Sequence, residues 1–377
     1  MPNGFGLGFA DGLTVFVALA AAGDTPVVEI TQLKKKSAFC EIVEVIVPSP
    51  DRIAPPCKYF GTCGGCDFQQ MTYSAQLDAK IGIVRDCLKR IGKIDWQGDI
   101  PIIRSPHEFE YRSRAQWHID RTGKKFGYLK RNSHEVIDVD TCLVLVPELD
   151  AELRRLRGAI NWEELWDDEA RIDAASGFDG AVSIYSDELN EPTNEVVSTA
   201  GGERFAYSAR AFFQGNRYMV EQLVEAALGG ASGESALDLY CGVGLFSLPM
   251  ARKFGQVTAV EENEAAVEFA EKNAISAKLD NIQFWAASVR DFLKSTESKT
   301  ADFLLLDPPR VGAEPETIVK IAELRPAEVS YVSCEPSMLA RDLRILLDRG
   351  YAVRSITALD LFPQTHHVET VVRVALR

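Results

Sequence analysis

The chain has 377 residues, of which 46% are hydrophobic and 25% charged, an ordinary composition for a folded globular protein. Its formal net charge of −14 argues against a uniformly basic nucleic-acid-binding protein, although binding depends on local patches. The apolar run Val15–Ala22 is too short for a membrane span and lacks the basic residues that open a signal peptide. We therefore expect a cytoplasmic protein, a monomer with no membrane partner.

Residues 1–50 are predicted to form a small β domain. Short apolar runs at Thr14–Val17, Val27–Ile30 and Ile42–Val47 are interrupted by turn residues and by the lysine run Lys34–Lys36. Short strands with glycine turns are typical of small barrels that bind RNA. They are also compatible with a plain β-subdomain that carries one solvated lysine run, and the pattern leaves both interpretations open.

Residues 51–205 are predicted to form a central domain of mixed, mostly strand-like character. A loop rich in proline, cysteine and glycine occupies residues 51–66. Apolar residues at helical spacing predict a helix over Tyr73–Ile91, which we expect to pack on the C-terminal domain. The segment Arg104–Glu135 holds eight basic residues against four acids. A basic face that binds RNA is therefore compatible with the acidic chain.

Residues 206–377 are predicted to form a doubly wound α/β domain. Short apolar runs alternate with helical patterns such as Ala265–Ile275 and Ser337–Leu347, which is typical of a parallel sheet between two helix layers. The last strand, Val368–Ala375, is expected to pair antiparallel with a strand at Ser355–Leu359, at the sheet edge. The other predicted strands are Ala236–Tyr240, Val257–Val260, Ile282–Trp285, Phe303–Leu306 and Val329–Ser333.

A glycine loop follows the first strand of this domain. Gly242 and Gly244 permit a tight turn, and Glu261, at the end of the next strand, is placed to bind ribose hydroxyls. The dinucleotide fingerprint requires a third glycine where this chain has Ser247. The carboxylate of Asp238 would repel a pyrophosphate, whereas it suits the cationic end of S-adenosylmethionine (SAM). The loop therefore favours SAM over NAD.

Three chemically capable side chains lie at strand ends of the same sheet. Asp307 ends the fourth strand, Cys334 follows the fifth and Glu369 lies at the start of the last. Ligands of open α/β sheets bind beyond the carboxyl ends of the parallel strands. We therefore expect an acid, a thiol and a second acid in one crevice with the cofactor. Arg310 stands where methyltransferases of exocyclic amines carry an aromatic residue, so that an amine substrate is disfavoured.

A thiol and a base beside SAM fit methylation at carbon 5 of uracil. Carbon 5 becomes nucleophilic only after a thiolate adds to carbon 6, and a base must later remove its proton so that the thiol can leave. Cys334 fits the nucleophile and Glu369 the base. The alternative is an inert buried thiol and a carboxylate at a strand edge.

Three cysteines are crowded into the loop of the central domain. Cys57, Cys63 and Cys66 have a spacing that indicates metal ligation in a reducing compartment rather than disulfides. A four-thiolate site needs one more ligand, for which Cys142 and Cys87 are the candidates. Because only one short C-x2-C pair is present, the spacing favours a [4Fe–4S] cluster over zinc.

With these motifs the sequence resembles the RNA uracil-5-methyltransferase family, in its iron–sulfur branch, over nearly the whole chain. The resemblance implies a Rossmann-like class I methyltransferase domain over residues 206–377. It further implies an RNA-binding barrel of the TRAM type over residues 1–50 and an iron–sulfur domain over residues 51–205. The matching segments are Gly4–Glu29 with Lys34–Lys36, Cys57–Gln70 with Cys142, Phe212–Asn216, Asp238–Gly244, Asp307–Gly312, Ser333–Leu343 and Phe362–Glu369.

The resemblance also implies roles for individual residues. Cys334 is the expected nucleophile and Glu369 the expected base. Leu245 and Ser288 depart from the polar residues that the family often has at their positions, which puts two SAM contacts in doubt. The implied SAM-binding residues are Gln214, Tyr240, Gly242, Glu261 and Asp307, and the implied cluster ligands are Cys57, Cys63, Cys66 and Cys142.

The resemblance favours RNA as the partner, with large-subunit (23S) ribosomal RNA ahead of transfer RNA. Two alternatives stay open at this point. One is an RNA-binding iron–sulfur protein with an inactive methyltransferase fold, which Leu245 favours and the Cys334–Glu369 pair opposes. The other is an RNA cytosine-5-methyltransferase, which also uses a thiolate. That chemistry favours a Pro-Cys motif after the fourth strand, where this chain has Asp307-Pro308-Pro309.

Overall fold

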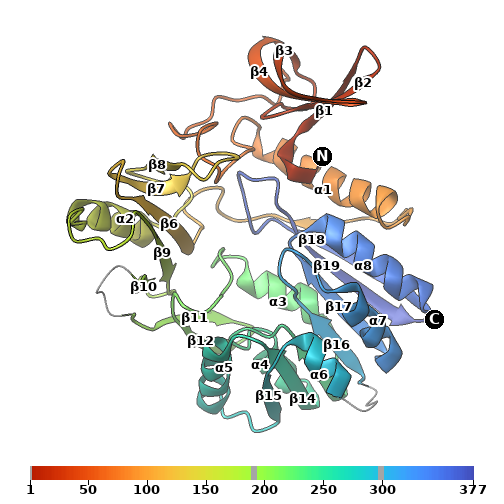
Figure 1. Ribbon diagram of the computed structural model, residues 1–377. Helices are drawn as coiled ribbons and strands as arrows, with labels where there is room; N and C mark the ends of the chain where they lie inside the picture. Colours follow the sequence, from red (N-terminus) through yellow and green to blue (C-terminus); the bar gives the residue numbers. More distant parts are fainter. Residues whose placement is uncertain (1, 188–192, 296–300) are drawn as a thin grey trace.

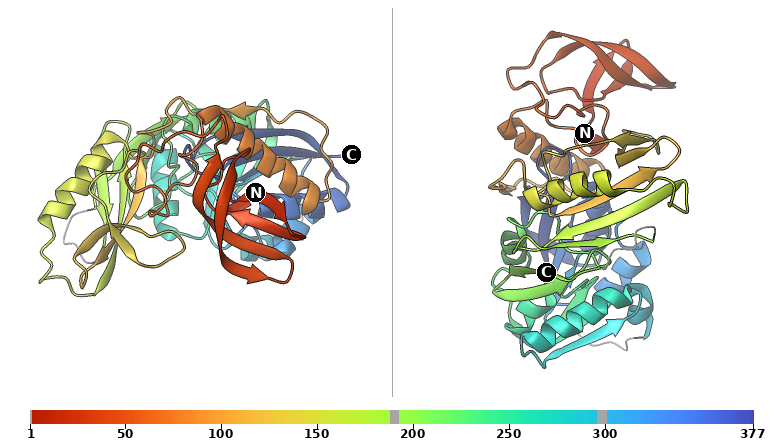
Figure 2. Two further views of the ribbon diagram at one scale, coloured as in Figure 1. Left: turned by 90° about the horizontal axis from the view of Figure 1, so that it is seen from above. Right: turned by 90° about the vertical axis from the view of Figure 1, so that its left-hand side faces the viewer.

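The computed structural model describes residues 2–187, 193–295 and 301–377 (Figure 1). Three bodies follow one another along the chain: an N-terminal sheet at one end, a central sheet beside it, and a large C-terminal sheet flanked by helices (Figures 1 and 2). None of the helices in the described part of the chain combines the length and apolar character that a membrane crossing requires.

The N-terminal body is an open four-stranded sheet in the order β1-β2-β4-β3. Its two outer pairs are antiparallel, and β2 and β4 pair in parallel at its centre. No pairing among the described residues joins β1 to β3, so the barrel expected here is not confirmed. After a 3-10 turn at Pro2–Gly4, the strands are β1 Gly6–Ala10, β2 Leu13–Val17, β3 Thr25–Lys34 and β4 Ser37–Val47.

The central body begins with helix α1, Tyr73–Arg90, which starts where the Thr72 hydroxyl accepts a hydrogen bond from the Ala75 amide. A five-stranded antiparallel sheet follows, in the order β10-β9-β6-β7-β8, and helix α2 covers it around the buried Trp117. A two-stranded ribbon, β11-β12, leads into the C-terminal body. The bounds are β6 Arg114–Asp120, β7 Lys125–Leu129, β8 Val136–Asp138, α2 Pro147–Ala159, β9 Glu169–Ser176, β10 Val182–Tyr185, β11 Val196–Ala200 and β12 Glu203–Tyr207.

The C-terminal body is an eight-stranded sheet in the order β15-β14-β13-β16-β17-β19-β18-β5. The first five strands in this order are parallel, as the alternating pattern predicts. β5 Ile102–Ile103, from the central part of the chain, adds the outermost strand. The other strands are β13 Gly233–Leu239, β14 Phe254–Glu261, β15 Ile282–Ala286, β16 Phe303–Leu306, β17 Glu328–Ser333, β18 Tyr351–Leu359 and β19 Glu369–Leu376.

The last strand differs from expectation in one respect. β19 is antiparallel to β18, as predicted, but it lies inside the sheet between β17 and β18 rather than at its edge. The reason is visible in its side chains, because the adjacent residues Val371 and Val372 point to opposite faces and both are buried. A strand that is apolar on both faces is stabilised between two neighbours and covered by helices on each side.

Helices cover both faces of this sheet. One apolar core is built against α1, α6, α7 and α8, and the other against α3, α4 and α5. α1 lies beside α8, where Val84 and Leu88 belong to the same core as Leu339 and Leu343. The helices are α3 Val220–Leu228, α4 Ser247–Ala251, α5 Glu264–Ser276, α6 Val289–Ser295, α7 Pro315–Leu324 and α8 Pro336–Asp348.

Candidate active site and cysteine pocket

The acid, the thiol and the second acid meet at one end of the sheet. Asp307 follows β16, whose Leu306 pairs with Leu239 at the end of β13. Cys334 follows β17, and Glu369 begins β19. Since β19 runs antiparallel to β17, its first residue reaches the same edge as the carboxyl ends of the parallel strands. The structure thus brings together the three residues that the sequence placed in one crevice.

Burial and neighbouring charge raise the pKa values of both reactive groups. Burial, followed by the charge of Glu369, raises the pKa of the Cys334 thiol to about 12, and Arg310 opposes this rise. Glu369 is 3% exposed, and burial together with Asp307 raises its pKa well above the usual value. Arg310 is the cation that favours the ionised form of both groups.

The glycine loop makes a tight turn between β13 and α4. Tyr240, Gly242 and Gly244 all have positive φ, of 66°, 54° and 90°. The Gly242 amide donates a hydrogen bond of 3.0 Å to one carboxylate oxygen of Glu261, and the Asn263 amide donates to the other at 2.9 Å. The carboxylate is therefore held beside the loop, with lone pairs left to accept hydrogen bonds from ribose hydroxyls.

Gln214 lies beside Asp307, which follows β16. The Gln214 side chain, 6% exposed, donates to Asp307 across 3.5 Å. Burial raises the pKa of Asp307 to about 7. Asp238, by contrast, lies fully buried behind the loop, where its carboxylate accepts a hydrogen bond from the hydroxyl of Ser247. Asp238 therefore holds Ser247 at the start of α4, and the expectation that its carboxylate suits the cationic end of SAM stays a prediction.

The two departures from the family pattern have different surroundings. Leu245 is 6% exposed and packs in the apolar core around α3, α4 and α5. Ser288 precedes α6, and its hydroxyl accepts a hydrogen bond from the Asp291 amide at 3.1 Å. Leu245 is thus a core residue, while Ser288 acts as a helix cap.

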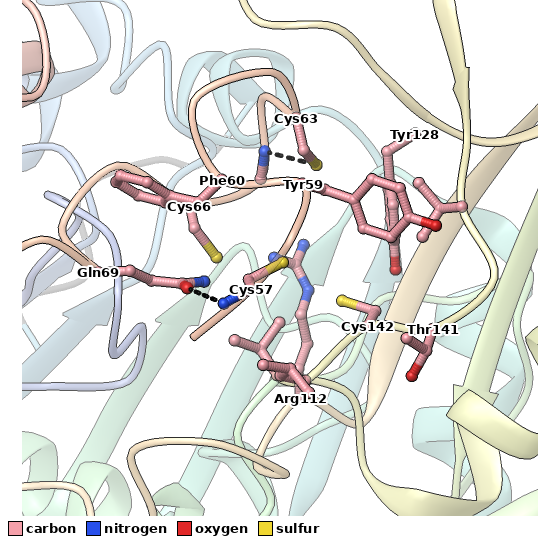
Figure 3. A pocket seen from close by; sticks show the side chains of 14 residues that line it. Cys57, Tyr59, Phe60, Cys63, Cys66, Gln69, Arg112, Tyr128, Thr141 and Cys142 are labelled. Carbon is pink, nitrogen blue, oxygen red and sulfur yellow. Dashed lines mark hydrogen bonds between the residues drawn. The ribbon is translucent and has the colours of Figure 1, made fainter. Parts of the chain in front are cut away.

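The four cysteines expected to bind a metal cluster line one pocket (Figure 3). Three belong to the loop before α1, and Cys142 comes from the segment between β8 and α2. Cys87, the other candidate, is 1% exposed in the core between α1 and α8 and does not line this pocket. The fold therefore distinguishes between two cysteines that spacing left open. The four that line the pocket are Cys57, Cys63, Cys66 and Cys142.

The pocket is apolar, but it holds one buried cation. Burial raises the pKa of Cys63 to about 11, and it raises the pKa values of Cys66 and Cys142 as well. The guanidinium of Arg112 lies among the thiols and favours their ionised forms (Figure 3). Among the described residues, no group of three or more His, Cys, Asp and Glu side chains converges tightly enough to hold a metal ion.

Sequence analysis missed the residues that join the central domain to the segment before Glu369. Lys80 and Gln76, on one face of α1, contact this segment, as do Tyr111 and Asn216. The available signal was the presence of two polar side chains, Gln76 and Lys80, in line with the apolar positions Val84 and Leu88, each four residues from the next.

Comparison with known proteins gives consistent results across the chain. A family model described as tRNA (uracil-5-)-methyltransferase matches residues 190–376. The chain is 31% identical to an RNA methyltransferase of Thermosynechococcus vestitus, over 98% of this chain and 94% of the relative. It is 33% identical to an RNA methyltransferase of Thermotoga maritima, over 98% and 96%.

A solved structure is similar over the same extent. It is the tRNA (uracil-54, C5)-methyltransferase of Pyrococcus abyssi in complex with S-adenosyl-L-homocysteine, with a TM-score of 0.76 and 25% sequence identity. The alignment covers 99% of this chain and 98% of that one. The aligned region therefore includes all three bodies of the fold.

Proposed function

Because the chain belongs to the RNA uracil-5-methyltransferase family, we propose that it transfers a methyl group from SAM to carbon 5 of a uracil in RNA. The observation that carries the proposal is the meeting of Cys334, Asp307 and Glu369 at one end of the sheet, beside the glycine loop. Cys334 supplies a nucleophile and Glu369 a base, the two groups that covalent methylation of a pyrimidine needs.

Cys334 opens the reaction. Its thiolate forms a bond to carbon 6 of the uracil, and the electrons of the ring double bond move to give an enolate with nucleophilic carbon 5. Carbon 5 takes the methyl group, which SAM supplies when bound. Glu369 then removes the proton from carbon 5, the double bond re-forms, and the thiolate leaves. The uracil must be turned out of any stacked helix, since carbon 6 is otherwise out of reach of a thiol.

The charges of the site fit this order of steps. Glu369 raises the pKa of Cys334, so the thiolate forms most readily while Glu369 is protonated. Once the sulfur is bonded to carbon 6 it carries no charge, and Glu369 is free to ionise and act as a base. Arg310, which lowers both pKa values, is placed to stabilise whichever group is charged.

We propose that SAM lies across the glycine loop. Gly242 and Gly244 would approach it with their backbone, Glu261 would accept from its ribose hydroxyls, and Tyr240 would pack beside it. Gln214 and Asp307 would face its reacting end. Leu245 does not oppose this, because its side chain lies in the core and leaves the loop backbone in place. The alternative of an inactive fold therefore loses its main support.

We also propose that the cysteine pocket holds a [4Fe–4S] cluster. Four thiolates on one zinc ion would lie about 4 Å apart, given a Zn–S distance of about 2.3 Å. In a cubane each thiolate binds a different iron, so the sulfurs stand farther apart. Four thiols that line one pocket are a donor set that fits the cluster, and Arg112 would offset its negative charge. Bound, the cluster would cross-link the loop before α1 to the segment before α2.

We consider two candidate RNA substrates, ribosomal RNA and transfer RNA. The cysteine pocket supports the iron–sulfur branch and with it 23S ribosomal RNA, our first candidate. The similarity to a tRNA (uracil-54, C5)-methyltransferase favours transfer RNA as the second. The test is methylation of undermethylated ribosomal and transfer RNA by the purified protein and labelled SAM, followed by nucleoside analysis and mapping. We expect 5-methyluridine at one position of the large-subunit RNA. Label in 5-methylcytidine, or in neither RNA, would contradict the proposal.

A further inference from the structure

The segment 360–368 connects β18 to β19 and ends at the proposed base, Glu369. It contains no helix or strand, and within it the amide and hydroxyl of Thr365 both bond to the carbonyl of Phe362. Other hydrogen bonds reach it from outside, as when Tyr111 donates from its hydroxyl to the carbonyl of Pro363 at 2.8 Å. The path of this segment therefore depends on the residues that surround it.

Helix α1 turns a buried polar face toward this segment. Tyr73, Gln76 and Lys80 are three and four positions apart, so they lie along one side of the helix. All three are buried, and the same side of the helix continues into buried apolar residues such as Val84, which packs on α8. Polar side chains in a helix–sheet interface cost desolvation free energy unless they are paired. Their partners are in the segment and beside it.

Lys80 holds the beginning of the segment. Its ammonium group, with no exposed surface, forms an ion pair with the equally buried Asp360 and donates to the carbonyl of Phe362 at 2.9 Å. Burial is the main influence on the Lys80 ammonium and lowers its pKa, while Asp360 opposes this. A buried ion pair adds little net stability, because desolvation offsets much of the attraction. The directional contacts of Lys80 instead fix the position of the start of the segment.

Gln76 holds the middle of the segment. Its side-chain carbonyl accepts from the Gln364 amide at 3.0 Å, and its amino group donates to the Gln364 side chain at 3.0 Å. Gln364 is 2% exposed and has φ of +68°, a left-handed conformation that is unfavourable for a residue with a side chain. The two bonds from α1 stabilise that conformation shortly before Glu369.

Glu369 begins β19, where its backbone pairs with Leu359 of β18. Its Oε1 atom is buried and has no hydrogen-bond partner among the described residues. The position of the carboxylate is therefore set by the backbone that leads to it. We propose that Lys80 and Gln76 are positioning residues for Glu369, which act through the segment 360–368 and affect proton removal from carbon 5 rather than methyl transfer. This inference rests on the proposed function.

The experiment separates the two steps in single-turnover reactions. Methyl transfer is followed with labelled SAM, as methylated RNA that is free or bound to protein. Proton removal is followed as tritium released from RNA that carries [5-³H]uracil. The main variant is Lys80→Met with Asp360→Leu, which replaces the ion pair by apolar side chains and leaves no unpaired charge. Gln76→Met is the second variant, and it keeps the ion pair if the double variant does not fold.

Proton removal should slow by about 10- to 100-fold in these variants, since a misplacement of about 1 Å can cost that much. Methyl transfer should change far less, so a covalent protein–RNA adduct accumulates. Val84→Ala, one turn beyond Lys80 on the same buried side of α1, is the matched control, because Val84 has no polar group that could hydrogen-bond to the segment. Val84→Ala should leave the ratio of the proton-removal rate to the methyl-transfer rate unchanged.

An unchanged ratio in the folded variants would overturn the inference. An equal loss of both rates, without adduct, would also overturn it and leave Lys80 and Gln76 with a purely structural role. Wild-type protein that releases no tritium would contradict the proposed function itself, and the inference with it. The wild-type reaction therefore distinguishes the two failures.

Discussion

Cys334 and Glu369 lie beside each other where β17 ends and β19 begins. β17 and β19 pair antiparallel up to Ser333 opposite Thr370, so Cys334, which follows β17, lies beside Glu369, which precedes Thr370. Residues opposite each other in antiparallel strands place their side chains on the same face. A thiol and a carboxylate from distant parts of the chain are thereby held side by side, and the charge of Glu369 raises the pKa of Cys334.

The first prediction concerns the reactivity of Cys334 without RNA. Because its pKa is raised to about 12, the thiolate fraction at neutral pH is small and should grow about tenfold per pH unit up to pH 10. Alkylation by iodoacetamide, followed by mass spectrometry of the Cys334 peptide, measures this. Arg310→Met should slow alkylation further, since Arg310 lowers this pKa. A rate that levels off near pH 8.5, as it does for free cysteine, would contradict the account.

The second prediction concerns SAM binding. Glu261→Ala removes the acceptor that we assign to the ribose hydroxyls, together with the hydrogen bond from the Gly242 amide. The dissociation constant for SAM should rise about 10- to 100-fold, the range expected for a lost hydrogen bond to a charged group. Calorimetry measures it. The neighbouring exposed acid provides the control, and Glu262→Ala should bind like the wild type. Equal effects of both substitutions would point to net charge rather than to a contact.

The third prediction concerns the cysteine pocket. Protein purified without oxygen should contain iron and acid-labile sulfide, and Cys142→Ala should lose most of both. Cys87→Ala should keep them, because Cys87 lies in the core between α1 and α8. Elemental analysis of the three proteins measures this. One zinc per chain without sulfide, or equal iron loss in both variants, would refute the cluster and its fourth ligand.

The sequence predicted the parallel strands of the C-terminal sheet because their apolar runs alternate with helical spacing over short distances. It also placed Asp307, Cys334 and Glu369 at one edge, since strand direction alone determines which ends meet. The interior position of β19 was missed, although the burial of both Val371 and Val372 was foreshadowed by consecutive β-branched residues.

Other features depend on contacts between distant segments and left little trace in the sequence. β5 has only two residues, too few for a pattern, and becomes a strand because β18 offers it an edge. Cys142 and Cys87 are equivalent by spacing, and only the path of the central domain brings Cys142 to the other thiols. The pairing of Lys80 with Asp360 joins residues far apart in the chain.

The order of the chemical steps leads to the last prediction. If Glu369 is the base, its removal should spare thiolate addition and methyl transfer and block only the release of the product. Glu369→Gln keeps the shape of the side chain but cannot accept the proton. Incubated with SAM and substrate RNA, this variant should accumulate RNA joined to Cys334 through a methylated uracil.

Denaturing electrophoresis of labelled RNA with the Glu369→Gln protein is therefore the most direct measurement. The account predicts a protein–RNA band that survives denaturation, carries label from the methyl group of SAM, and is absent when Cys334→Ala is added to the same variant. Normal turnover by Glu369→Gln, or a band that persists without Cys334, would contradict the covalent mechanism proposed for this site.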